Sequence, residues 1–415
     1  MSETPPNHTA EDLLDYIDAS PSPWHAVSQA ARRLEAKGYQ CLDEAEPWEL
    51  EAGGGYYVVR GGSSLIAFRL GERPLAEAGY RMVGAHTDSP GLRVKPRAGE
   101  AKGGLGVLGV EVYGSPILAT FTDRDLTLAG RVQVRGSSGP AERLLHFDRP
   151  LVRLPNLAIH MNRSVNEDGL RLDRHQALPL LLEGLREEVG PAERFRALVA
   201  ERLEVAPDEV VAWNLAVADT QPGTLWGPGD AHIADSQLDN LASVHAAVEA
   251  LPAESGDFGA AVVACYDHEE VGSESDRGAA SDFLEAVLAR IAEAQGLDAG
   301  DQARALARSW LLSADGAHAY HPHYPAYHDD QYPVRVNGGP VVKINAAQRY
   351  MTDDRGEALF TELCRLAGVE GQTYVHRGDL PCGSTIGPLL AARLGVATLD
   401  AGLAMWAMHS LRESA

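Results

Sequence analysis

The sequence predicts an α/β sandwich with a mainly parallel central sheet, interrupted by an inserted β-rich domain. Two observations predict it. From about residue 231 onward, strand-like and helix-like segments alternate, which is typical of parallel α/β sheets. Between about residues 98 and 230 the pattern changes to glycine-rich and β-rich segments. We therefore expect a main domain formed by residues 1–97 and 231–415, with an inserted domain at 98–230.

Composition and charge narrow the class of protein. The chain has 415 residues, 45% hydrophobic and 23% charged, which is ordinary for a globular protein large enough to bury its own core. Any metal would therefore serve chemistry and not folding. Since 59 acidic residues against 36 basic ones give a net charge of −23, long-range electrostatics oppose binding to nucleic acid or an anionic membrane.

The amino terminus and the cysteines point to the cytoplasm. MSETPPNHTA has neither the basic start nor the apolar core of a signal peptide, and no run of about 18 apolar residues occurs in the sequence. The four cysteines lie far apart, form no CxxC pair, and fit buried apolar side chains better than disulfides.

The first part of the main domain is expected to contain two helices and three strands. Thr9, with Asp12 three residues on, marks the start of one helix, and Ser22-Pro23 marks the start of the next. Three β-rich runs follow, at 56–60, 64–70 and 80–85.

The inserted domain is expected to be β-rich to about residue 160, helical at 176–204 and β-like again at 209–217. Residues 104–109 satisfy the GxGxxG pattern of dinucleotide sites. However, polar residues precede this pattern where a strand is needed, and β-prone residues follow it where a helix is needed. A glycine-rich turn or bulge is the better interpretation.

The second part of the main domain alternates regularly. A stripe of Leu241, Val244, Val248 and Leu251 predicts a helix. Further helices are expected near 281–295 and 356–368, and strands at 260–266, 309–315, 340–345 and 397–402.

Potential metal ligands follow four of these strands. They are His86 and Asp88, the acidic run from Asp267 to Glu270, Asp315 with His318, and His409. Asp239 lies just before a predicted helix, where the helix dipole favours a carboxylate. Because open α/β sheets place their sites at strand ends, we expect these groups to converge.

Each residue alone has an ordinary structural explanation. The acidic run suits a solvated loop, His86 a core or surface imidazole, and Asp239 a helix cap. The histidine-rich tract at 315–330 could bind metal adventitiously. Their joint occurrence at strand ends argues against these explanations.

Metal-assisted hydrolysis accounts for these residue types. Zinc accepts imidazole nitrogens and carboxylate oxygens, and a two-metal site needs one bridging carboxylate with further ligands on each side. A neighbouring carboxylate that is not a ligand can take a proton from the attacking water, so adjacent glutamates can supply a base and a ligand.

At this point the sequence resembles the aspartyl aminopeptidases, a family of dinuclear zinc peptidases. The similarity covers nearly the whole chain. It is carried by ordered blocks, which are GAHTDSPGLRVKP at 84–96, VEVYGSPILATFTDRDLTLAGRV at 110–132, LPNLAIHMNRSVNE at 154–167, SQLDN at 236–240, DHEEVGSES at 267–275, SADGAHAYHP at 313–322, GGPVVKINAAQRY at 338–350, PCGSTIGP at 381–388 and AMHSLRE at 407–413. One departure is Phe121-Thr122, where a bulkier pair is expected; it affects packing of the insert and no proposed ligand.

The resemblance implies a role for each site residue. Asp239 would bridge two zinc ions, with His86 and Asp315 completing one site and Glu270 and His409 the other. Glu269 would be the general base, and Asp88 would orient the imidazole of His86. The substrate-binding residues would be His160, His318, Lys343 and Tyr350. His160, from the insert, would polarise the scissile carbonyl or the oxyanion, and some descriptions of the family also link it to the metal.

The resemblance also implies the reaction and the assembly. A water activated by two zinc ions would release the N-terminal residue, preferably Asp or Glu, from peptides with a free N-terminus; Co²⁺ or Mn²⁺ could replace zinc. Lys343, with Arg349 behind it, is the candidate cation for an acidic side chain, although a solvated lysine is the ordinary alternative. The insert would serve dimerisation and build a tetrahedral homododecamer, in which His160 could act in its own or a neighbouring subunit.

Two other functions fit the sequence. A carboxypeptidase or N-deacylase of related fold would keep the dinuclear site but change the substrate. A non-catalytic assembly or peptide-binding protein would keep only the remains of a site, which the presence of Glu269 and every proposed ligand argues against.

Overall fold

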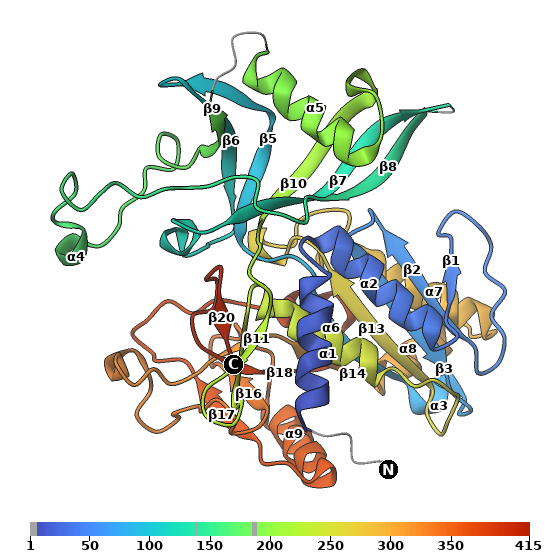
Figure 1. Ribbon diagram of the computed structural model, residues 1–415. Helices are drawn as coiled ribbons and strands as arrows, with labels where there is room; N and C mark the ends of the chain where they lie inside the picture. Colours follow the sequence, from blue (N-terminus) through green and yellow to red (C-terminus); the bar gives the residue numbers. More distant parts are fainter. Residues whose placement is uncertain (1–5, 138, 185–188) are drawn as a thin grey trace.

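The computed structural model describes residues 6–137, 139–184 and 189–415. It contains two main sheets, one above the other in the view of Figure 1. Nine strands form the larger sheet: β1 (Gln40–Leu42), β2 (Gly55–Arg60), β3 (Ser64–Leu70), β4 (Tyr80–His86), β13 (Ala260–Tyr266), β14 (Trp310–Ala314), β16 (Val341–Ile344), β17 (Gln372–Val375) and β18 (Ala397–Gly402).

The larger sheet is mixed, with a parallel centre. Its order is β1-β2-β3-β13-β4-β14-β18-β16-β17, and β13, β4, β14 and β18 run parallel to one another. Strands β3 and β16 are antiparallel to their neighbours β13 and β18. The predicted α/β sandwich with a mainly parallel central sheet is confirmed. The central strands are almost continuously apolar, as expected for a sheet covered on each face.

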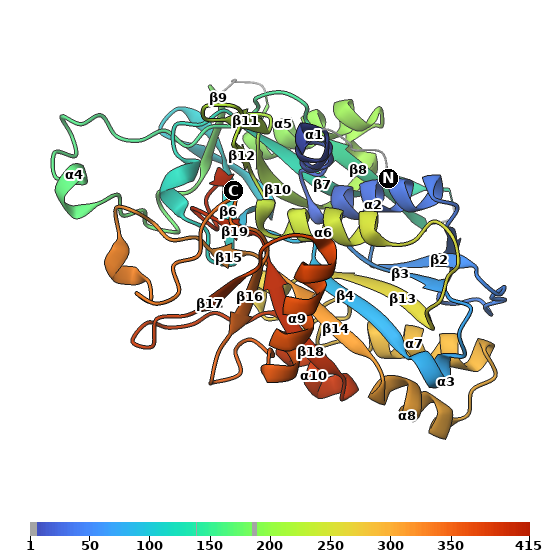
Figure 2. The same cartoon turned by 90° about the horizontal axis from the view of Figure 1, so that it is seen from below.

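Helices cover the two faces of this sheet (Figure 2). On one face pack α1 (Pro6–Asp18), α2 (Pro23–Ala36) and α6 (Leu238–Ala250). On the other face pack α3 (Leu75–Ala78), α7 (Phe283–Ala294), α8 (Ala299–Ala307) and α10 (Ile386–Leu394). Helix α9 (Asp354–Ala367) packs through Phe360 and Cys364 against Leu399 of β18. Among the described residues, no helix is both long and apolar enough to cross a bilayer.

The second sheet is antiparallel and has its own core. Its strands, in the spatial order β8-β7-β10-β5-β6-β9, are β5 (Gly91–Lys102), β6 (Leu105–Tyr113), β7 (Leu126–Gly136), β8 (Gly139–His146), β9 (Leu180–Gly184) and β10 (Val210–Asp219). Helix α5 (Pro191–Leu203) contributes Phe195 and Val199 to its core. Between β8 and β9 the chain runs outward through a long segment that holds α4 (Val165–Asp168), at the left of Figure 1.

Two small sheets involve the last part of the chain. β11 (Thr224–Trp226), β12 (His232–Asp235) and β20 (Glu413–Ser414) form one small sheet. β15 (Ala317–His318) and β19 (Ala404–Met405) form a parallel pair. The carboxyl terminus therefore lies beside the segment that leads into α6.

Several elements differ from the sequence-based expectations. The expected helix at 176–204 is wrong at residues 180–184, which form β9; residues 185–188 lie outside the described part of the chain, and the helix that follows starts at Pro191. Leucine-rich residues have good helix propensity, but here they complete the edge of the second sheet by pairing with β6. The first helix begins by Pro6, before the expected Thr9, while α8, α10 and β17 had no clear signal.

Three smaller expectations can be compared directly with the structure. The GxGxxG pattern is not a dinucleotide loop: Gly103 and Gly104, with φ of 59° and 80°, form the turn between antiparallel β5 and β6. Phe121 is only 1% exposed and packs in the core of the second sheet, so this departure from the family pattern is accommodated. All four cysteines are free, and Cys41 is exposed, unlike the expected buried position.

Candidate metal centre

Three central strands bring their carboxyl ends to one edge of the larger sheet. Parallel pairing sets Tyr266 of β13 opposite His86 of β4, and Ser313 of β14 opposite Gly84. The residues that follow these strands therefore emerge at the same level as His86. They include Glu269 and Glu270 after β13 and Asp315 after β14. The register of a parallel sheet thus assembles groups that lie far apart in the sequence.

Asp239 lies between two imidazoles at this edge. The Nε2 atom of His86 is 3.5 Å from Asp239 Oδ1, and the Nε2 atom of His409 is 3.6 Å from Asp239 Oδ2. His409 Nε2 is also 3.3 Å from Glu270 Oε1. Each oxygen of the Asp239 carboxylate thus faces a different imidazole, the arrangement that a bridging carboxylate requires.

The donor atoms fit zinc. Ligands about 2.0–2.2 Å from a tetrahedral ion lie roughly 3.4 Å from one another, close to the three separations above. One ligand atom each from His86, Asp239 and Glu270 can be chosen so that all lie within 4.8 Å of one another. Asp239 Oδ1 is buried and has no hydrogen-bond partner among the described residues, which leaves it available to a cation. The chain can therefore hold zinc through these nitrogen and oxygen donors.

In each imidazole, the Nδ1 atom is hydrogen-bonded to a backbone carbonyl oxygen. Nδ1 of His86 is 3.0 Å from the carbonyl oxygen of Asp88, and Nδ1 of His409 is 3.1 Å from the carbonyl oxygen of Ser115. A carbonyl can only accept, so each Nδ1 carries the proton. Each Nε2 therefore faces Asp239 and is the nitrogen that would offer its lone pair to a bound metal.

Asp88 supports the loop that carries the two glutamates. Its buried carboxylate accepts hydrogen bonds from the backbone N–H of Glu269 and of Glu270, each at 3.1 Å, and from the Tyr113 hydroxyl at 2.6 Å. Its Oδ1 is also 3.5 Å from Nδ1 of His86. Asp88 therefore positions the imidazole and the glutamate loop together.

The electrostatics of the centre favour cations. Burial opposes the charge on His409, but Asp239 and Glu270 raise the pKa of its imidazole to about 11. Burial raises the pKa of Asp315 above its ordinary value, against the opposing charge of Lys343. Burial, with nearby Asp315 and Glu270, raises the pKa of Glu269 to about 8. A group with such a pKa can take up and release a proton near neutral pH.

A cleft of about 680 Å³ opens over these groups. His318, Lys343 and Tyr350 line it, as expected for substrate-contacting residues, and Arg349 lines it too. Lys343 is 2% exposed, and its Nζ lies 3.3 Å from Asp315 Oδ1 and donates to the carbonyl oxygen of Gly316 at 3.1 Å. The charge of Lys343 is therefore partly neutralised by Asp315, a proposed ligand. Arg349, by contrast, is exposed.

His160 lies outside the cleft of its own chain. It is exposed and belongs to the segment between β8 and β9. Its neighbours Leu157, Ile159 and Met161 are exposed apolar side chains, with Met161 75% exposed. Within a single chain the structure thus brings together every other predicted site residue but leaves this histidine apart.

Several residues around the centre had no signal in the sequence. Tyr113 and Ser115 come from the second sheet and the segment after it, and each contacts a site residue through the bonds described above. Asn240 donates from its side chain to the carbonyl oxygen of Ala314 at 2.7 Å and so joins α6 to β14. Glu413 ends the AMHSLRE block four residues after His409, a position that could have drawn attention to its carboxylate.

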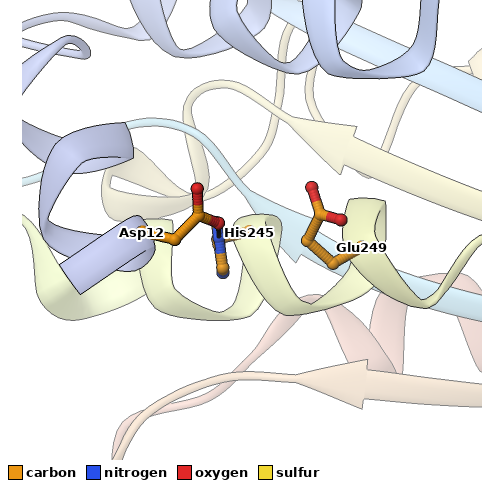
Figure 3. Close-up of side chains that lie close together, drawn as sticks. All are labelled: Asp12, His245 and Glu249. Carbon is orange, nitrogen blue, oxygen red and sulfur yellow. Dashed lines mark hydrogen bonds and ion pairs between the residues drawn. The ribbon is translucent and has the colours of Figure 1, made fainter. Parts of the chain in front are cut away.

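A second cluster of possible ligands lies away from the cleft. Asp12, His245 and Glu249 lie close together between α1 and α6 (Figure 3). However, Arg33 binds Asp12 at 2.8 Å and Glu249 at 3.0 Å, and Lys37 binds Glu249 at 2.9 Å. Because two cations already neutralise the carboxylates, we interpret this cluster as an ion-pair network that joins three helices.

The fold and the donor set together define a metal-dependent hydrolase. The family model described as Aminopeptidase I zinc metalloprotease (M18) matches residues 16–415. The chain is 48% identical over 410 residues to a probable M18 family aminopeptidase 2 of Pseudomonas aeruginosa, covering 98% of this chain and 94% of that protein. It belongs to the M18 family of zinc aminopeptidases, as the sequence blocks predicted.

Solved structures agree with this assignment. The chain resembles one in the cryo-EM structure of the Ape4 and Nbr1 complex, with a TM-score of 0.94 and 37% identity, covering 98% of this chain and 82% of that one. It also resembles the mApe1 dodecamer of S. cerevisiae, with a TM-score of 0.83 and 27% identity, covering 98% of this chain and 93% of that one.

Proposed function

We propose that this zinc aminopeptidase uses two zinc ions to remove the N-terminal residue of peptides, with a preference for Asp or Glu. The observation that carries the proposal is the carboxylate of Asp239, each of whose oxygens faces a different imidazole. Asp239 would bridge the ions, with His86 and Asp315 on one side and Glu270 and His409 on the other. Bound zinc supplies Lewis-acid polarisation of the scissile carbonyl and lowers the pKa of water.

The proposed general base is Glu269. Its neighbour Glu270 turns toward His409, and the loop that carries both is held by Asp88 through two backbone hydrogen bonds. Glu269 lines the cleft, and its pKa of about 8 suits transfer of a proton from the attacking water to the leaving amine. Fixing the backbone of Glu269 also lowers the entropic cost of placing its carboxylate.

The preference for an acidic residue is proposed from the cations of the cleft. Among the described residues that line it, Lys343 and Arg349 are the lysines and arginines. The net charge of −23 repels acidic peptides at long range, but such fields weaken over about 8 Å at physiological salt. Local cations can therefore decide which side chain is accepted.

We further propose a homo-oligomer, specifically a tetrahedral dodecamer, in the cytoplasm. The mApe1 structure of S. cerevisiae is described as a dodecamer. The exposed apolar residues around His160 suit a contact with a second copy of the chain, where His160 could enter a neighbouring cleft and polarise the substrate carbonyl. In light scattering we expect a species many times the mass of one chain, 44.4 kDa. A fully active monomer would contradict the assembly.

The general base is tested by Glu269→Gln. We expect the variant to keep its zinc and to lose about 10²–10⁴-fold in kcat, since proton transfer typically contributes that factor.

Comparing free with N-acetylated peptides tests the substrate class, because an aminopeptidase needs the free amine. Cleavage of both, or of the acetylated peptide alone, would favour the N-deacylase or carboxypeptidase alternative. A zinc-loaded wild type without activity would favour a binding protein.

A further inference from the structure

Glu413 contacts two segments of the metal centre at once. It lies in β20, next to the carboxyl terminus, and is 2% exposed. Its Oε2 accepts the backbone N–H of Asp239 at 2.9 Å, and its Oε1 accepts the backbone N–H of His409 at 2.6 Å. One carboxylate therefore joins two proposed ligands from opposite ends of the second part of the chain.

These two ligands lie on backbone that has little support from regular structure. Asp239 and Asn240 have non-helical φ and ψ at the start of α6. His409 lies outside regular secondary structure, with a φ of 67° in the left-handed region. A residue other than glycine stays in that region only where its surroundings hold it there. The hydrogen bond to Glu413 is one such restraint, and the N–H of Ile117, which donates to the carbonyl oxygen of His409 at 2.9 Å, is another.

The position of Glu413 itself is fixed by pairing between strands. β20 is antiparallel to β12, with Glu413 opposite Asp235. In the described part of the chain, no lysine, arginine or histidine forms an ion pair with Glu413. A buried carboxylate without an ion-pair partner is costly, and cations bound by the adjacent ligands would offset that cost. The burial of this carboxylate is therefore better explained by a role in the metal centre than by a role in the core.

We propose that Glu413 is a positioning residue of the metal centre, whose carboxylate fixes the backbone of Asp239 and His409 so that their side chains converge on the metals. The inference rests on the proposed function, in which these two residues are zinc ligands. Asp239 would receive additional support from Ser89, whose hydroxyl donates to its carbonyl oxygen at 2.9 Å.

The test compares Glu413→Gln with Asp235→Asn. Each change turns a buried carboxyl group of the same small sheet into an amide, but within the described part of the chain the Asp235 side chain forms no hydrogen bond or ion pair with a proposed ligand. A glutamine can accept only one of the two N–H groups through its single carbonyl oxygen. We expect E413Q to bind zinc about 10–100-fold more weakly in competition with a chelator, and its cobalt-substituted form to show an altered visible spectrum. D235N should match wild type in both measurements.

Each outcome decides the matter. Wild-type zinc affinity and cobalt spectrum in E413Q, or equal losses in D235N, would overturn the inference. If E413Q does not fold, E413D, whose shorter side chain can reach only one N–H group, is measured in its place with the same expectation. If neither folds while D235N does, Glu413 acts in overall stability and the inference fails. A wild type that binds no zinc would instead refute the proposed function.

Discussion

Asp88→Asn tests how far one buried carboxylate organises the centre. Asp88 accepts three hydrogen bonds, two from backbone N–H groups of the glutamate loop and one from Tyr113. Asparagine keeps one acceptor oxygen and places an NH₂ group at the other position. If the asparagine oxygen accepts the N–H of Glu269, its NH₂ group faces the N–H of Glu270, and that hydrogen bond is lost. The Tyr113 hydroxyl can rotate and accept a hydrogen bond from the NH₂ group.

The variant therefore loses one backbone hydrogen bond to a charged acceptor, which is worth about 1.5–3 kcal/mol. Asp88→Ala loses all three and should destabilise the protein at least twice as much. The free energy lost in the loop also weakens zinc binding, and supports of metal ligands typically contribute 10–100-fold in affinity. We expect D88N to fall within that range when zinc affinity is measured against a chelator.

Tyr113→Phe provides the matched control. It removes the bond from the hydroxyl but leaves both backbone N–H bonds to Asp88. We expect it to retain most of the zinc affinity that D88N loses, with a smaller change in melting temperature. Zinc affinity at the wild-type level in D88N, or an equal loss in Y113F, would refute the reasoning.

Three further predictions follow from the cleft, the small sheet and the helix network. Arg349→Ala should lower kcat/KM for acidic N-terminal residues more than for neutral ones. Lys343→Ala should lower kcat/KM for both substrate types, and more for the acidic one, because Asp315 also loses its ion-pair partner. Equal losses on the two substrate types, measured on one peptide scaffold, would exclude a role in selectivity. Burial, with Asp18 nearby, raises the pKa of Asp235 to about 8, so the folded state holds a proton that the unfolded state releases near pH 4. The contribution of Asp235 to folding stability should therefore fall as pH rises from about 4 to 8, by up to about 1.4 kcal/mol per unit. The stability of D235N relative to wild type in denaturant titrations should increase over that window, and a pH-independent difference would contradict the shift. Finally, Arg33→Met should lower the melting temperature without changing zinc content, since Arg33 joins Asp12 and Glu249 away from the cleft; a loss of bound zinc would show that this network is linked to the centre.

The sequence alone determined the class of the protein and most strands of its larger sheet. Apolar runs of strand length predicted β2, β3, β4, β13, β14, β16 and β18 because strands buried on each face are recorded locally as continuous apolar segments. The ligand types at the ends of those strands, with the ordered sequence blocks, were enough to predict a zinc aminopeptidase. Local sequence failed at residues 180–184, where leucines favour a helix but pairing with β6 decides the strand.

Only the tertiary structure decided how the centre is held. The imidazoles of His86 and His409 face different oxygens of Asp239. This arrangement arises because the parallel strands β13, β4 and β14 end at the same edge of the sheet, and because β20 pairs with β12, just before α6. Tyr113, Ser115 and Glu413 contact the site through bonds that join segments far apart in the chain, and no local pattern records such contacts. Residue types reveal which chemistry is possible, whereas distances between them depend on packing over the whole chain.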